Sequence, residues 1–122
     1  MCAVVGIFGT PDAAKTAYYA LFAMQHRGQE ATGIAVADGT QIRMRKKRGL
    51  VTSVFHEGNL SQLTGTCAIG HNRYSTAGKE SVEDAQPLFA RYKLGEIAIA
   101  HNGNLTNKLS VRNELIDRKS VV

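Results

Sequence analysis

Apolar residues at the start of the chain follow first a strand pattern and then a helical one. Residues 3–8 are apolar and partly β-branched, and turn residues follow them, which predicts a buried strand that begins almost at the amino terminus. From Ala14 to Met24 the apolar residues recur at helical spacing. A helix is therefore expected here, with Thr10 as its cap and Gly28 as its end.

The middle of the chain predicts a hairpin. Residues 31–37 are strand-like in composition, Asp38-Gly39 is a strong two-residue turn signal, and residues 41–48 alternate enough to form the returning strand. A further short apolar strand is expected at residues 66–70, where it leads into a polar, histidine-containing turn.

The last third of the chain predicts another hairpin and a helix. Residues 87–92 and 96–100 form the expected strands on either side of Leu94-Gly95. Thr106 can cap a final helix that carries a few apolar residues. Hairpins with two interspersed helices imply mostly antiparallel sheets with helices packed on their faces, an α+β fold.

Composition limits the class of protein. The 122 residues fit one small domain, and the 43% hydrophobic content is enough for a folded core. Neither a secretion signal nor an apolar run near the roughly 20 residues that span a bilayer is seen, so a cytoplasmic protein without membrane contact is expected. Cys2 and Cys67 are expected to be free thiols, and they form neither a disulfide framework nor a paired-cysteine zinc site.

The positive charge is local. The net charge is +5, and one short segment supplies five of the fifteen basic residues. Without that segment the remaining basic and acidic residues balance, so a basic strand edge or a site for anionic partners is favoured over a nucleic-acid-binding surface. The five residues are Arg43, Arg45, Lys46, Lys47 and Arg48.

A cysteine at position 2 has a special chemistry if Met1 is removed. The new terminal residue then carries a thiol and a free α-amine, whose ordinary pKa is about 7.7–8.0. The amine can accept the thiol proton and later protonate a leaving group, so one residue supplies nucleophile and base. Alternatively, Cys2 merely begins a strand as a small apolar residue.

Three polar segments interrupt the strand pattern, at residues 25–30, 70–78 and 100–105. In the third, Asn102-Gly103 offers an amide donor and a backbone N–H, which could form an oxyanion hole. An ordinary Asn-Gly turn is the alternative.

Arg73 offers a planar guanidinium suited to a substrate carboxylate, with Tyr74 and Thr76 beside it. A solvated surface arginine is the alternative to this role. In the same way, His71 and His101 could each be a hydrogen-bonded structural histidine.

Together these segments resemble the class II glutamine amidotransferases, most closely the amidophosphoribosyltransferases that open de novo purine synthesis. The resemblance rests on four stretches in the family's order, which span nearly the whole chain: MCAVVGIFG (1–9), QHRGQEATGI (25–34), GHNRYSTAG (70–78) and AHNGNL (100–105). Glucosamine-forming relatives typically have tyrosine in place of His26 and tryptophan in place of Tyr74, so the purine enzyme is favoured.

The resemblance implies a fold and a set of site residues. The fold is the four-layer αββα sandwich of the amino-terminal-nucleophile hydrolases, incomplete at the C-terminus. Cys2 attacks the glutamine side-chain amide, and Asn102 with the N–H of Gly103 stabilises the oxyanion. Arg73 binds the α-carboxylate of glutamine. The remaining pocket residues are Tyr74, Thr76 and Arg27.

The resemblance also implies partners and missing parts. Glutamine is the substrate of residues 1–122, a partial amidotransferase domain. Ammonia passes to a phosphoribosyltransferase domain, absent here, that converts phosphoribosyl pyrophosphate to 5-phosphoribosylamine. Magnesium and any iron–sulfur cluster are expected only in that missing part, and no cofactor is expected in this chain. The full-length enzyme is expected to be a homo-oligomer that binds neither membrane nor nucleic acid.

Three departures from the family pattern bear on activity. Ala3 replaces a common glycine, and Asn72 replaces an apolar or small residue, which could alter loop packing. An aspartate that binds the α-amino group of glutamine in relatives lies beyond Val122. The isolated chain is therefore expected to be poorly active. The alternatives are a non-catalytic remnant or assembly module of the same fold and a basic nucleic-acid-binding module.

Overall fold

A four-stranded antiparallel sheet is the central element of the computed structural model, which describes residues 2–25, 29–74, 84–103 and 105–118. Its strand order is β1-β4-β2-β3, and a separate antiparallel hairpin is formed by β5 and β6. The elements are β1 (Ala3–Phe8), α1 (Ala13–Ala23), β2 (Ala31–Ala37), β3 (Ile42–Arg48), α2 (Val51–Val54), α3 (Glu57–Leu60), β4 (Cys67–Arg73), β5 (Leu88–Tyr92), β6 (Gly95–Ile99) and α4 (Lys108–Asp117).

The register of the sheet brings three strand ends together. Ala3 at the start of β1 pairs with Asn72 near the end of β4. Ala31 at the start of β2 pairs with Arg73 at the end of β4. Residues around the amino terminus and the end of β4 therefore meet at one end of the sheet, although about seventy positions separate them in the sequence.

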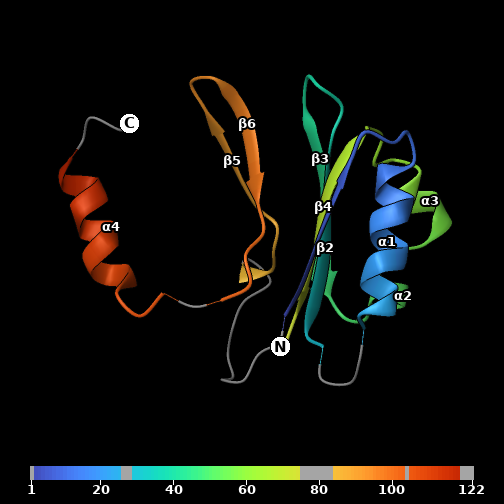
Figure 1. Cartoon of the computed structure of the whole chain (residues 1–122), viewed down its shortest axis with the longest axis horizontal. Coiled ribbons are helices and arrows are strands. Elements are labelled where there is room, and N and C mark those ends of the chain that lie inside the picture. The colour runs from blue at the N-terminus through green and yellow to red at the C-terminus, as the bar shows by residue number, and fades with distance from the viewer. Residues whose placement is uncertain (1, 26–28, 75–83, 104, 119–122) are drawn as a thin grey trace.

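Helix α1 covers one face of this sheet, with α2 and α3 beside it (Figure 1). The core between them is fully buried at Leu21, Ile34 and Val36, and Phe55 adds to it after α2. Gly70 is the contact point of β4, because a Cβ atom there would lie 2.8 Å from Leu21 Cδ1. Glycine at this position lets the helix pack closely on the central strand.

The β5–β6 hairpin lies on the other face, and α4 lies beyond the hairpin (Figure 1). Helix, sheet, sheet and helix thus follow one another, which confirms the predicted αββα order. One contact between the sheets is the Glu96 carboxylate, which accepts a 2.6 Å hydrogen bond from the Ile42 N–H. None of the residues of α4 is buried.

The strand predictions are confirmed, with differences at the ends of elements. Strand β4 continues to Arg73, three residues beyond its expected end. Helix α1 begins at Ala13 after Asp12, and Thr10 does not cap it. The reason is that the N–H groups of Gly9 and Thr10 both bind the Thr66 carbonyl, which holds this segment outside the helix.

The short helices α2 and α3 were not predicted. Each is four residues long, so neither shows a repeating apolar spacing. Helix α3 begins at a reciprocal cap in which His56 and Asn59 bind each other's backbone N–H groups. Helix α4 is capped at Asn107, without a side-chain hydrogen bond, whereas the sequence pointed to Thr106.

Candidate functional site

Cys2 lies directly before β1 and is half-buried. Continuing the β1–β4 register by one residue puts Cys2 opposite Arg73. Val5 and Ile7 pack against the α1 core. Because side chains alternate along a strand, Cys2 is directed to the opposite face, toward the β5–β6 hairpin. Its thiol Sγ lies 3.9 Å from the Tyr74 carbonyl oxygen.

The loop after β6 brings Asn102 to this cysteine. The Asn102 Nδ2 atom donates a 3.1 Å hydrogen bond to the carbonyl oxygen of Cys2, across 100 residues of sequence. Gly103 follows with φ of 150°, a conformation that side chains rarely adopt. A Cβ atom at Gly103 would also lie 3.0 Å from His101 Nε2. The predicted oxyanion donors thus lie beside the predicted nucleophile.

Arg73 lies at the same end of the sheet and on the same face as Cys2. It is the last residue of β4, and its Nη1 atom donates a 2.6 Å hydrogen bond to the Asp84 carbonyl. The structure therefore brings together four of the predicted site residues: Cys2, Arg73, Asn102 and Gly103.

Tyr74 contributes its backbone and its side chain in different places. The carbonyl lies beside the Cys2 thiol. The hydroxyl lies 3.2 Å from the Met24 carbonyl, at the end of α1, and 3.2 Å from Gln29 Oε1, two residues before β2. The ring therefore supports the α1 layer. Two other predicted pocket residues, Arg27 and Thr76, lie outside the described residues.

Two histidines and a glutamine connect the Asn102 loop to the sheet. His71, which is 1% exposed in the middle of β4, has its Nε2 atom 3.1 Å from the His101 carbonyl oxygen. The backbone N–H of His101 donates a 2.6 Å hydrogen bond to Gln86 Oε1. Burial lowers the pKa of His71, and the hydrogen bond to His101 opposes that shift in part. Sequence reasoning missed Gln86, because no local pattern marks its partner.

Asn72 has a structural role that the sequence did not indicate. Its side chain is fully buried on the α1 face of the sheet. Its Oδ1 accepts a 2.8 Å hydrogen bond from Thr32 Oγ1, and its Nδ2 donates a 2.9 Å bond to the Leu21 carbonyl. The residue that departs from the family pattern thus joins two strands and α1.

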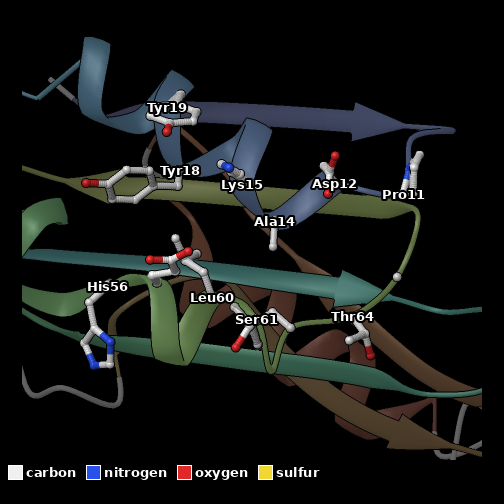
Figure 2. Close-up of a pocket in the computed structure, with 13 residues that line it drawn as sticks. Pro11, Asp12, Ala14, Lys15, Tyr18, Tyr19, His56, Leu60, Ser61 and Thr64 are labelled. Atoms are coloured by element: carbon white, nitrogen blue, oxygen red, sulfur yellow. The ribbon is translucent and has the colours of Figure 1, made fainter.

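Two cavities of the described chain are lined by residues other than the predicted site residues. One, of about 550 Å³, lies between α1 and α3, where Lys15, Tyr18 and His56 line it (Figure 2). The other, of about 300 Å³, lies between the sheets beside Cys67 and Ala98. Cys67 pairs with Phe8 at the far end of β1, roughly 20 Å from Cys2 at about 3.4 Å per residue.

The basic segment on β3 binds its own chain. Arg43 forms an ion pair with Asp38, which holds the pKa of that carboxyl well below its usual range. Arg45 donates to the Val54 carbonyl. Lys46, whose pKa burial lowers, donates to the carbonyls of Ala85 and Pro87. These cations thus stabilise the packing around β3.

The described residues include no group of three or more histidine, cysteine, aspartate or glutamate side chains that could hold a metal ion. In the same part of the chain, no helix is long and apolar enough to cross a membrane.

Comparisons with known proteins agree on one enzyme, although no family model matches the chain. The chain is 52% identical to an amidophosphoribosyltransferase of Archaeoglobus fulgidus over 118 residues, and 48% identical to a chloroplastic one of Vigna aconitifolia over 120 residues. These matches cover 94% and 98% of the chain but 25% of each relative. The chain thus spans about a quarter of the length of its relatives.

Two solved structures have the same fold as the whole chain. One is the glutamine phosphoribosylpyrophosphate amidotransferase of Bacillus subtilis complexed with ADP and GMP, with a TM-score of 0.83 and 41% identity. The other is described as the allosteric regulatory enzyme of purine biosynthesis, with a TM-score of 0.87 and 43% identity. This chain covers 26% of each.

Proposed function

Because residues 1–122 belong to the amidophosphoribosyltransferase family, we propose that they hydrolyse the side-chain amide of glutamine with Cys2 as the nucleophile. The ammonia released would aminate phosphoribosyl pyrophosphate elsewhere in the enzyme, giving 5-phosphoribosylamine for purine synthesis. The observation that carries the proposal is the position of Asn102, whose amide nitrogen lies 3.1 Å from the Cys2 carbonyl oxygen.

The nucleophile is activated by its own amine. Once Met1 is removed, the α-amine of Cys2 accepts the thiol proton and leaves a thiolate. The sulfur forms a bond to the amide carbon of glutamine, and the carbonyl electron pair moves onto oxygen. Collapse of this tetrahedral intermediate breaks the carbon–nitrogen bond, and the ammonium group returns its proton to the departing nitrogen. Water then cleaves the thioester to give glutamate and the free thiol.

The oxyanion is stabilised from the β6 loop. Asn102 has two amide hydrogens, so the bond to the Cys2 carbonyl leaves one for the oxyanion. The Gly103 N–H is the second donor. Both donors act on charge that develops only in the transition state, and each such donor contributes roughly a hundredfold or more in rate.

Arg73 would anchor the substrate. Its place opposite Cys2 across the β1–β4 ladder lets a guanidinium donor bind the α-carboxylate while the side-chain amide of glutamine reaches the thiol. In this proposal Thr76 and Arg27 complete the pocket by resemblance to the family, and Tyr74 contributes its backbone carbonyl beside the thiol.

Ammonia release from glutamine tests the proposal. The full-length gene product that contains residues 1–122 is compared with its Cys2→Ala and Cys67→Ala variants, after a mass measurement has established that Met1 is gone. We expect Cys2→Ala to abolish glutaminase activity and Cys67→Ala to retain it, since the two thiols lie at opposite ends of β1. Equal activity in the Cys2→Ala variant would refute the proposal.

A further inference from the structure

We propose that His71 is a positioning residue of the glutaminase site, which together with Gln86 fixes the peptide groups on both sides of His101 and so orients Asn102 and Gly103. This inference rests on the proposed function. It assigns a role in the same site to two residues that do not touch the nucleophile.

The loop that carries the oxyanion donors has little support of its own. Residues 101–103 are exposed and belong to neither a helix nor a strand. Among the described residues, three hydrogen bonds join this loop to other segments. In one of them Asn102 donates to the Cys2 carbonyl, and the other two involve the backbone of His101.

His71 ties the loop to an interior strand of the sheet, β4. It is paired with Val4 of β1 and with Gly33 of β2, so hydrogen-bonded strands flank it on both sides. Its Nε2 atom must donate, because the His101 carbonyl oxygen can only accept. This carbonyl belongs to the peptide group that also contains the Asn102 N–H. The hydrogen bond therefore fixes the orientation of the peptide plane that precedes the Asn102 side chain.

The other ring nitrogen of His71 keeps the imidazole in one form. Its Nδ1 atom is buried and has no hydrogen-bond partner in the described chain. Protonation would place an unpaired N–H in this buried position, and burial accordingly lowers the pKa of His71. Near neutral pH the ring is therefore neutral, with its hydrogen on Nε2, where the loop requires it.

Gln86 holds the preceding peptide group. Its Oε1 accepts the His101 N–H at 2.6 Å. Gln86 is itself fixed over β2, since a Cβ atom at Gly33 would lie 2.2 Å from its carbonyl oxygen. Lys46 bonds the carbonyls of the residues on either side, Ala85 and Pro87. His101 is thus held at its N–H and its C=O by two supports from different segments.

Loss of either support should affect the chemical step selectively. A displacement of about 1 Å in a catalytic group can cost on the order of a hundredfold in rate. The oxyanion forms only after attack, so misplaced donors lower kcat and leave glutamine binding nearly unchanged. A residue needed only for folding would not produce that division between kcat and KM.

The test compares His71→Leu with His71→Gln in the full-length gene product. Leucine fills a similar volume without a donor, whereas the glutamine side-chain NH₂ can reach about the position of Nε2. We expect His71→Leu to lower kcat for glutamine hydrolysis roughly tenfold or more with KM changed less than about threefold, and His71→Gln to recover most of kcat. An unchanged kcat in His71→Leu, or an equal loss in both variants, would overturn the inference.

A glutamine analogue with an aldehyde in place of the amide supplies a second measurement. Its adduct with Cys2 is tetrahedral and carries its oxygen in the oxyanion hole. We expect its affinity to fall in His71→Leu by about the same factor as kcat, while the affinity for glutamate stays constant. Parallel loss of both affinities would indicate a general collapse of the pocket and count against the inference.

Gln86 gives an independent pair of variants if His71→Leu does not fold. Gln86→Met removes the acceptor and should lower kcat selectively. Gln86→Glu retains an acceptor oxygen and should retain most of kcat. Asn59→Leu is the matched control, because Asn59 is a buried polar residue of α3 whose Nδ2 bonds the Val54 carbonyl far from the site. It should lower stability and leave kcat unchanged, and a kcat loss equal to that of Gln86→Met would contradict the inference.

The failure of the inference can be told from the failure of the proposed function. Wild-type protein without Cys2-dependent glutamine hydrolysis refutes both. Wild-type protein with this activity, whose kcat is insensitive to His71→Leu and Gln86→Met, refutes the positioning role alone.

Discussion

At the scale of single residues, the site depends on backbone geometry as much as on side-chain chemistry. Gly103 adopts a φ of 150°, and the His101 ring occupies the space beside it. Any side chain at this position would strain the backbone and push against the ring. Its N–H could then no longer keep the direction that the proposed role as an oxyanion donor needs.

We therefore expect Gly103→Ala to lower glutaminase kcat roughly tenfold or more with a smaller effect on KM. Gly39→Ala is the matched control, because Gly39 also has a positive φ, of 96°, but lies in the β2–β3 turn with open space around it. It should cost about 1–2 kcal/mol of stability and leave kcat unchanged. Steady-state kinetics with a thermal unfolding curve for each variant would check this, and a Gly103→Ala enzyme with normal kcat would contradict it.

The residues that could be predicted from sequence were those with a local signature. Asn102-Gly103 is recognisable as a turn or a donor pair, and Cys2 stands out by its place after Met1. Asn72 and Gln86 could not be assigned, because their partners lie 51 and 15 residues away and only the folded chain brings them together. Hydrogen bonds between residues this far apart cannot be recognised from the local spacing of residue types in the sequence.

At the scale of elements, the β5–β6 hairpin is placed by polar contacts as well as by packing. Glu96 accepts hydrogen bonds from the Ile42 N–H at 2.6 Å and from Arg91 Nε at 3.1 Å. The Ile42 bond, and secondarily Arg91, hold the pKa of Glu96 below its usual range. Because the hairpin leads into the Asn102 loop, this contact at its tip helps to place the site at its other end.

The hydrogen bond between the Ile42 N–H and the Glu96 carboxylate should weaken in acid. The folded-state pKa of Glu96 is lowered, so its stabilisation is complete above the ordinary glutamate value of about 4.3 and is lost as the pH falls through the folded pKa. We expect the Ile42 amide, followed by hydrogen exchange, to lose protection over that acidic range. In Glu96→Gln the amide acceptor should give pH-independent protection instead. An Ile42 amide equally protected in Glu96→Ala would contradict this role, and Arg91→Ala is the control that leaves the main bond intact.

Long elements were predictable and their arrangement was not. The apolar runs at β1 and β2 and the turn signal at Asp38-Gly39 gave the correct strands, because each pattern is complete within a few residues. Helices α2 and α3 are too short to show a period. The side of the sheet on which the hairpin packs is decided by contacts such as Gly33 with Gln86, which no pattern in either segment reveals.

At the scale of the whole molecule, the outer face of the β5–β6 hairpin is apolar and exposed. Leu88, Ile97 and Ile99 are 50%, 41% and 54% exposed, and the register puts all three on the face directed away from the main sheet. Contiguous exposed apolar surface of this kind favours association.

We expect a polypeptide of residues 1–122 to self-associate as its concentration rises, and the double variant Ile97→Thr, Ile99→Thr to do so less. Tyr19→Ser is the control, since it removes a similarly exposed apolar side chain, 58% exposed, from α1. Sedimentation velocity over a range of concentrations would measure the effect. Equal association of the double variant and the parent polypeptide would exclude this face as the cause.

Covalent labelling would reveal whether Cys2, as the processed terminal residue, is the nucleophile that we propose for a glutaminase site. The protein is incubated with a glutamine analogue that carries an electrophilic ketone, and the modified peptide is then mapped by mass spectrometry. We expect one adduct, on Cys2 in chains that have lost Met1, formed more slowly when glutamine is present. An adduct on Cys67, or equal labelling of chains that retain Met1, would rule out Cys2 as the processed nucleophile.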